Sequence, residues 1–249
     1  MSILAIASLV VVAAGFVAGQ TVNPDTTVAA TQQQIVDLHN ALRRKNPSTG
    51  SFELSWDSEA AQKAADWAAL CHFWHPNSTT DQPLYRKTSK YDLGQNLYST
   101  SGGPVNWQSA TDNWYSEIAD FIYGQPPKNS KAAVGHYTQI VWNTTFVVGC
   151  AYKDCGSFKF YVCNYGPAGN ISPNLYAPYE AGTACAKCTG ETTCRNGLCL
   201  NPCPVTNTLS NCDTSVVVGG KTYPPLGCTT AYASQCQATC QCKGKGKLY

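Results

Sequence analysis

The chain has 249 residues and a formal net charge of +2. This near-neutral balance excludes a charge-driven nucleic-acid-binding protein and gives no reason to expect an acidic lipid surface as partner. The length allows one domain with a substantial core and one small appended part.

The N-terminal stretch has the character of a secretory leader. It carries no charged side chain through Gln20, and a mostly apolar run extends from Ile3 to Ala18. This run is shorter than the roughly 20 apolar residues of a membrane span, and it ends in small residues that suit cleavage before Gln20. We therefore predict a signal peptide over residues 1–19 and a secreted, extracellular protein that is not integral to the membrane. An N-terminal membrane anchor is the alternative.

Two helices are predicted in the first third of the chain. Thr31 and Gln34 have the spacing of a capping box, and apolar residues then recur at helical intervals until the break at residues 46–47. The second helix is expected over about residues 57–71, where alanines form a small face suited to close packing.

The next segment, residues 76–106, is rich in Pro, Ser, Thr, Gly and Asn and is expected to be irregular. A third helix is predicted over about residues 106–123, because aromatic and aliphatic residues there could face the core. They are Trp107, Trp114, Ile118 and Phe121.

Three strands are predicted after the helices, because β-branched and aromatic residues are enriched over residues 137–142, 146–151 and 158–163. Helices followed by strands, without regular alternation, predict an α+β layered domain. Residues 170–182 are rich in Pro, Gly and Asn and are expected to form a linker.

Cysteine dominates the remainder of the chain. The protein has 14 cysteines, and ten of them lie between Cys185 and the C-terminus. In a secreted chain this density predicts a disulfide framework. A zinc knuckle beginning at Cys185 and Cys188 is the alternative, which the irregular spacing and an oxidising compartment disfavour. Sequons at Asn77 and Asn143 predict a glycoprotein, whereas the sequon at Asn170 is followed by Pro173.

Several motifs resemble those of the CAP superfamily. Residues 135–142 (GHYTQIVW) and 161–170 (YVCNYGPAGN) resemble its two signatures, and His39-Asn40 with Arg43 and residues 114–118 match two further segments. The spacing of the last cysteines resembles the hinge and cysteine-rich region of the cysteine-rich secretory proteins.

This resemblance implies a fold and a division of the chain. It implies an α-β-α sandwich CAP domain over residues 31–173 and a linker with a disulfide-bonded hinge over residues 174–199. Residues 200–249 would then form a small, disulfide-rich, mainly helical domain like those that regulate ion channels.

The resemblance also implies seven disulfide bonds: Cys71–Cys155, Cys150–Cys163, Cys185–Cys194, Cys188–Cys199, Cys203–Cys242, Cys212–Cys236 and Cys228–Cys240. The family has one further bridge, and its two cysteines correspond here to Leu93 and Gly166. Because both partners are missing together, no odd thiol remains.

Four positions match the residues that converge in the open cleft of the family. They are His75, Gln95, Glu117 and His136. Two imidazoles and a carboxylate can hold Zn²⁺, but Gln95 replaces a family acid and has no negative charge, so we expect weak zinc binding and no required cofactor. The alternative is a hydrogen-bonded polar cluster that holds the loops together.

The sequence and the resemblance indicate three candidate functions. The first is binding of an extracellular protein target, either an ion channel or a cell-surface receptor, through the cysteine-rich domain, with Lys221 and Tyr223 as channel-contact candidates. Ordinary surface residues are the alternative at those two positions. The second function is a sterol or lipid carrier that uses the CAP domain. The third is a hydrolase, which the missing acid at Gln95 disfavours, so the chain is expected not to be an enzyme.

Overall fold

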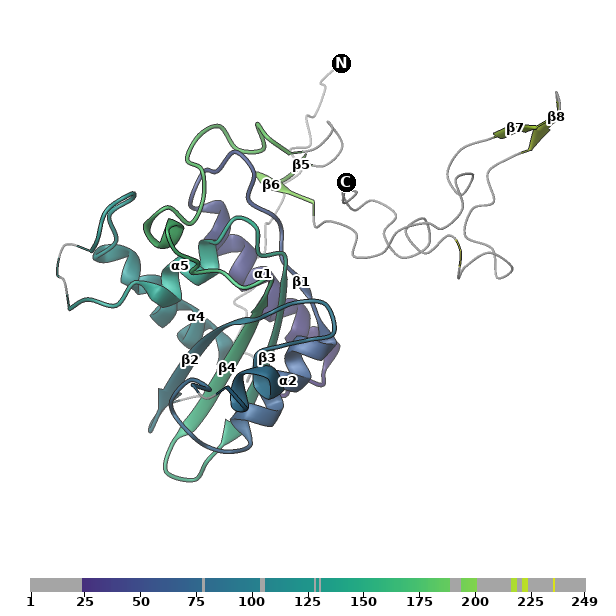
Figure 1. Ribbon diagram of the computed structural model, residues 1–249. Helices are drawn as coiled ribbons and strands as arrows, with labels where there is room; N and C mark the ends of the chain where they lie inside the picture. Colours follow the sequence, from purple (N-terminus) through teal and green to yellow (C-terminus); the bar gives the residue numbers. More distant parts are fainter. Residues whose placement is uncertain are drawn as a thin grey trace, which may run out of the picture.

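The computed structural model describes residues 24–77, 79–103, 106–127, 129, 131–188, 194–200, 216–218, 221–223 and 235. Its main feature is a four-stranded sheet in the order β1-β3-β4-β2 (Figure 1). Strand β1 pairs parallel with β3, and the other neighbours are antiparallel. The strands are β1 (Ser55–Trp56), β2 (Gly94–Thr100), β3 (Val147–Asp154) and β4 (Lys159–Gly166).

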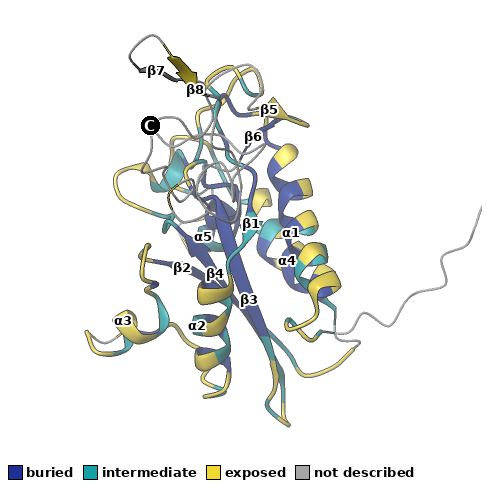
Figure 2. Cartoon of the chain, turned by 90° about the vertical axis from the view of Figure 1, so that its right-hand side faces the viewer, coloured by how far each residue is buried: buried dark blue, intermediate teal, exposed yellow. Residues whose placement is uncertain are grey.

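Helices cover both faces of this sheet. Figure 2 shows β3 and β4 buried over most of their length. One face packs against α1 (Ala29–Arg44), α4 (Trp107–Ser116) and α5 (Gly135–Val141), and the other packs against α2 (Ser58–Ala68). Alternate residues of a strand point to opposite faces, and Val148 accordingly joins the first core cluster while Ala151 joins the second. The predicted α+β architecture and three-layer sandwich are therefore observed.

Helix α2 lies unusually close to the sheet. Asp57 caps its N-terminus by accepting a 2.8 Å hydrogen bond from the Ala60 N–H. A Cβ atom added to Gly149 in β3 would lie 2.2 Å from the backbone nitrogen of Ala61. The glycine and the small face of the helix together allow the backbones to approach.

One predicted strand is wrong. Residues 137–142 mostly belong to helix α5, whose residues from Tyr137 to Val141 are all buried. The β-branched and aromatic side chains there pack against α1 and α4 instead of extending a sheet, so tertiary packing overrides local propensity. The capping box at Thr31 is also wrong, because α1 begins at Ala29 and Thr31 lies buried within its first turn.

The segment expected to be irregular contains the short helix α3 (Asp81–Tyr85) and strand β2. Strand β2 carries the polar residues Gln95 and Asn96 near its start, and their side chains hydrogen-bond to His75 and to the His136 carbonyl. The third helix is shorter than predicted: α4 ends at Ser116 and continues as the 3-10 turn η1 (Glu117–Ala119). Ile118 is 38% exposed and does not join the core.

The expected linker and hinge pack against the sandwich. The linker contains the 3-10 turn η2 (Asn174–Tyr176), and the hinge contains β5 (Cys194–Arg195) and β6 (Leu198–Cys199). Backbone hydrogen bonds join Thr49 N–H to Glu180 O (3.0 Å) and Cys199 N–H to Ser51 O (2.8 Å). We call residues 178–188 and 194–200 the docked segment.

Side chains secure the docked segment as well. Leu198 and Cys199 are almost fully buried. The Glu53 carboxylate forms ion pairs with Arg44 (3.4 Å) and with Arg195 of the docked segment. Residues up to Leu200 are therefore attached to the CAP body, which the resemblance places at residues 31–173.

Four disulfide bonds lie within the described residues, and they are the first four pairs implied by the resemblance: Cys71–Cys155, Cys150–Cys163, Cys185–Cys194 and Cys188–Cys199. The other six cysteines lie outside the described residues. The prediction of a mainly helical last domain also falls mostly on residues outside them. The residues described there form a hairpin of β7 (Val216–Val218) and β8 (Lys221–Tyr223).

At the two positions of the missing family bridge, the side chain of Leu93 packs beside Gly166. Leu93 is 2% exposed. A Cβ atom added to Gly166 would lie 3.3 Å from Cδ2 of Leu93 and 2.8 Å from Cγ2 of Val147. The leucine thus fills the space beside the glycine that a second side chain would otherwise enter.

Candidate functional site

Two histidine pairs form the centre of the site. His75, in the loop after α2, lies with Nδ1 2.9 Å from Oε1 of Gln95 on β2. His136, at the start of α5, lies with Nδ1 2.7 Å from Oε1 of Glu117. Because an amide or carboxylate oxygen can only accept, each ring donates from Nδ1, and its Nε2 carries the lone pair when the ring is neutral.

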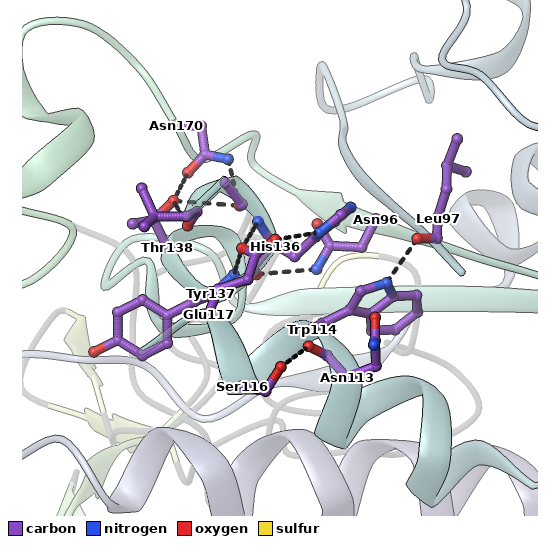
Figure 3. A network of polar contacts seen from close by, with 12 residues as sticks. Asn96, Leu97, Asn113, Trp114, Ser116, Glu117, His136, Tyr137, Thr138 and Asn170 are labelled. Atoms are coloured by element: carbon purple, nitrogen blue, oxygen red, sulfur yellow. Dashed lines mark hydrogen bonds and ion pairs between the residues drawn. The ribbon is translucent and has the colours of Figure 1, made fainter. Parts of the chain in front are cut away.

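Glu117 also caps the start of α5. Its Oε2 atom accepts hydrogen bonds from the backbone N–H groups of His136 (2.8 Å) and Tyr137 (3.1 Å), as Figure 3 shows. A carboxylate in this place satisfies open N–H groups and complements the partial positive charge of the helix end. Both oxygens of Glu117 are therefore engaged within the protein, and its role as a metal ligand stays a prediction.

The amide of Gln95 is fixed from both ends. Its Nε2 donates to Oδ1 of Asn164 on β4 (3.0 Å), while Nδ2 of Asn164 donates to the carbonyls of Ala60 and Tyr85. This chain of donors assigns the oxygen of Gln95 to His75. A carboxylate at position 95 would place an oxygen against the Asn164 oxygen.

Asn96 connects the site to the core. Its Nδ2 lies 3.1 Å from the His136 carbonyl and 3.3 Å from the hydroxyl of Tyr165. That hydroxyl lies 2.9 Å from Nε2 of His39, whose Nδ1 donates to the Ile35 carbonyl (2.8 Å). The backbone of α5 beside His136 is thus held by a buried network that reaches α1.

Asn96, Asn164 and Tyr165 are not among the site residues predicted from the sequence. The available signal was the asparagine in each of two motifs, Gly94-Gln95-Asn96 and Cys163-Asn164-Tyr165. A buried polar residue in a strand requires a partner, and these two asparagines lie on the paired strands β2 and β4.

Burial sets the protonation of the rings. Desolvation of the His75 ring lowers its pKa, and the nearby Arg86 and His136 lower it further, against the opposing effect of the hydrogen bond that His75 donates to Gln95. Burial likewise lowers the pKa of His39 to about 4, so this ring is neutral at pH 7. A neutral His75 keeps the lone pair that a metal ion requires.

The residues present do not complete a metal site. Among the residues that the structure describes, no group of three or more His, Cys, Asp and Glu side chains is placed to hold a metal ion. The two imidazoles can each offer Nε2, but Glu117 is occupied and Gln95 is neutral. The hydrogen bonds are those expected of a polar cluster, and weak zinc binding through the two Nε2 atoms stays a prediction.

The remaining candidate residues lie elsewhere. Lys221 is exposed on β8, and Tyr223 ends the same strand. Asn77 is exposed, and Asn143 is half-buried at the end of α5. No helix formed by the described residues has both the length and the apolar character to cross a membrane.

Comparison with known proteins identifies two matching regions. Residues 36–165 match the CAP family, described as the cysteine-rich secretory protein family, and residues 185–247 match the Crisp family. Human cysteine-rich secretory protein 2 is 40% identical over 226 residues, which cover 88% of this chain and 87% of that protein. Human cysteine-rich secretory protein 3 is 38% identical, with 87% and 85% covered.

Solved structures share the fold of the sandwich. NaASP2, whose crystal structure was determined with Zn²⁺, is 26% identical with a TM-score of 0.56, covering 69% of this chain and 96% of that one. Schistosoma mansoni venom allergen-like protein 4 is 26% identical with a TM-score of 0.52, covering 65% of this chain and all of the other.

Proposed function

The chain belongs to the cysteine-rich secretory protein family, and from this premise we propose that it is secreted and acts by binding an extracellular target. The proposed target is an ion channel, which the protein modulates or blocks through its C-terminal cysteine-rich domain. A cell-surface receptor is a variant of the same proposal. The Crisp match, which extends to residue 247, supports this assignment.

One structural observation carries the proposal: the docked segment ties the base of the cysteine-rich domain to the CAP body. Backbone hydrogen bonds to residues 49–53 and the ion pair between Glu53 and Arg195 attach this segment to the body, and two disulfide bonds cross-link it internally. A binding domain that starts from a fixed point loses less conformational freedom when it meets its target. The CAP body would thus serve as the scaffold that presents the domain.

The polar site supports binding rather than catalysis. Nδ1 of His75 pairs with a neutral amide, and Nδ1 of His136 pairs with a carboxylate that also caps a helix. A nucleophilic mechanism requires a base that is hydrogen-bonded to its nucleophile. The described cysteines, which could supply such a nucleophile, are all in disulfide bonds.

Zinc is a secondary element of the proposal. We infer that Zn²⁺ binds weakly through Nε2 of His75 and Nε2 of His136, with Gln95 and Glu117 orienting the rings. Partners that fix the second nitrogen of a ligating histidine are common around zinc. The Zn²⁺ in the structure of the related NaASP2 gives this inference its motivation.

Electrophysiology tests the main proposal. The full-length mature chain would be compared with a chain ending at Leu200, which keeps the docked segment, on a panel of cation channels. Loss of block in the shorter chain is expected. Lys221→Ala and Tyr223→Ala test the two contact candidates, and Lys153→Ala, at an exposed lysine of β3, is the control. Full block by the shorter chain would refute the proposal, and sterol and lipid binding by the CAP domain would then be measured.

A further inference from the structure

A groove lies where the linker crosses the end of α5. It has a volume of about 440 Å³, within the range of about 300–1,000 Å³ typical of small-molecule sites. Asn143 forms part of its wall, together with the aromatic rings of Tyr123 and Tyr179. Asn143 is also the first residue of the sequon Asn143-Thr144-Thr145.

The backbone of Asn143 is fixed while its side chain is open. Its N–H donates to the Pro178 carbonyl (2.8 Å), and its carbonyl accepts from the Phe52 N–H (3.0 Å). Its side-chain amide has no hydrogen-bond partner among the described residues. The asparagine therefore presents an available amide nitrogen, rigidly placed, at the edge of the groove.

The third sequon provides the contrast. Oδ1 of Asn170 accepts from the Thr138 hydroxyl (2.7 Å), and its Nδ2 donates to the Gly135 carbonyl (2.8 Å). A sugar on that nitrogen would remove a contact that holds the start of α5. The fold accommodates a glycan at Asn143 but opposes one at Asn170.

The walls of the groove have the chemistry that binds a sugar. Tyr123 is 44% exposed, and its ring lies 5.5 Å from that of Tyr179. The Tyr123 hydroxyl donates to the Tyr179 carbonyl (2.6 Å), which fixes the exposed ring. Ile171 adds an apolar edge that is 57% exposed, and Asn174 and Glu180 add polar groups. Apolar faces with a few polar groups are the usual lining of such sites.

The geometry points to this groove as the seat of the innermost N-acetylglucosamine of an N-linked glycan on Asn143. The attached sugar would contact both the CAP body and the linker, since Asn143 comes from one and Tyr179 from the other. Covalent attachment keeps the sugar at high effective concentration, so weak contacts suffice. The inference rests on the proposed secretion of the chain.

The test is the rate at which peptide N-glycosidase F releases the glycan, because this enzyme must reach the innermost sugar. The full-length chain would be secreted from an animal cell line, and glycopeptide mass spectrometry would follow release at Asn143 in native and denatured protein. We expect release from the native protein to be slower by about fivefold or more, the effect of one aromatic stacking contact. Tyr123→Ala should abolish this protection. Tyr123→Phe keeps the ring but loses the hydrogen bond that fixes it, so it should retain more protection than Tyr123→Ala.

Ile171→Ser is a second variant that should not disturb folding, because the Ile171 side chain contributes only exposed apolar surface at the rim of the groove. It should reduce the protection partly. Equal release rates from native and denatured protein would overturn the inference. So would a secreted protein without a glycan on Asn143, and in that case the proposed function would stand. A chain that never enters the secretory pathway would overturn both.

Discussion

Oε1 of Gln95 lies 2.9 Å from Nδ1 of His75, so this ring donates to a neutral amide. The equivalent atom of His136 faces the Glu117 carboxylate. The His75–Gln95 pair therefore lacks the negative charge that the His136–Glu117 pair carries, and zinc affinity should respond to this difference.

Gln95→Glu should tighten Zn²⁺ binding by about tenfold, or about 1–2 kcal/mol, because the added charge stabilises a bound cation. The same change should lower the stability of the metal-free protein by about 1–2 kcal/mol, because the hydrogen bond to Asn164 is lost. Isothermal titration and thermal unfolding measure the two effects.

His136→Ala should weaken zinc binding in either background. Zinc affinity unchanged by Gln95→Glu would show that the two histidine pairs do not share a metal ion, and the structural role would then account for all four residues.

The mature chain should contain no free thiol. Four bridges are present among the described residues, and the other six cysteines form an even set. Alkylation without reduction, followed by intact mass spectrometry, should give no added mass, and reduction should then expose 14 reactive sites. Stoichiometric labelling of one or two cysteines would contradict the assigned pairing.

His39 should make the fold sensitive to acid. Its pKa is about 4 in the folded protein against an ordinary value of 6.5, so the unfolded chain binds the proton more tightly. The contribution of the neutral ring is complete above pH 6.5 and is lost as the pH falls towards 4, by up to about 3 kcal/mol. Denaturant unfolding between pH 4 and 7 would measure this slope.

His39→Gln should unfold at a lower denaturant concentration at pH 7, but its free energy of unfolding should change less steeply with pH. His72→Gln, at an exposed histidine whose ring stacks on Trp74, serves as the control and should keep the native slope. An equal slope in the His39 variant would place the acid sensitivity elsewhere.

The docked segment should stabilise the CAP body. A chain ending at Gly182 loses the buried Leu198 and the hydrogen bonds between Cys199 and the loop at residues 51–53. It should be less stable than a chain ending at Leu200 by at least about 2 kcal/mol. Thermal unfolding of the two proteins tests this, and equal midpoints would mean that the contacts contribute nothing.

Leu93 should carry part of the stability that a bridge supplies in relatives. Leu93→Ala removes a buried side chain and should cost about 2–4 kcal/mol. Leu84→Ala, an exposed leucine on α3, is the matched control and should cost little. Chemical denaturation would separate the two cases, and a loss at Leu93 no larger than at Leu84 would contradict the packing argument.

The layered α+β class and helix α2 could be predicted from composition and periodicity. Helix α5 could not, because its β-branched residues satisfy a strand pattern and only burial against α1 and α4 decides the outcome. Strand β2 was missed for a related reason: Gln95 and Asn96 interrupt the apolar signal because they serve the polar site.

The four site positions were anticipated through the family motifs, but their division into two pairs required coordinates. In particular, nothing local in the sequence indicates that Glu117 caps the helix that carries His136, since the two residues are separated by a loop of irregular composition.

The packing of Leu93 beside Gly166 also decides whether a cross-link can form between these two positions. A cysteine at only one of these positions would leave an unpaired thiol in a compartment that oxidises thiols, and at position 166 its Cβ would collide with Val147. A cysteine at either position alone is therefore unfavourable, and a cross-link here requires both substitutions together with repacking of Val147.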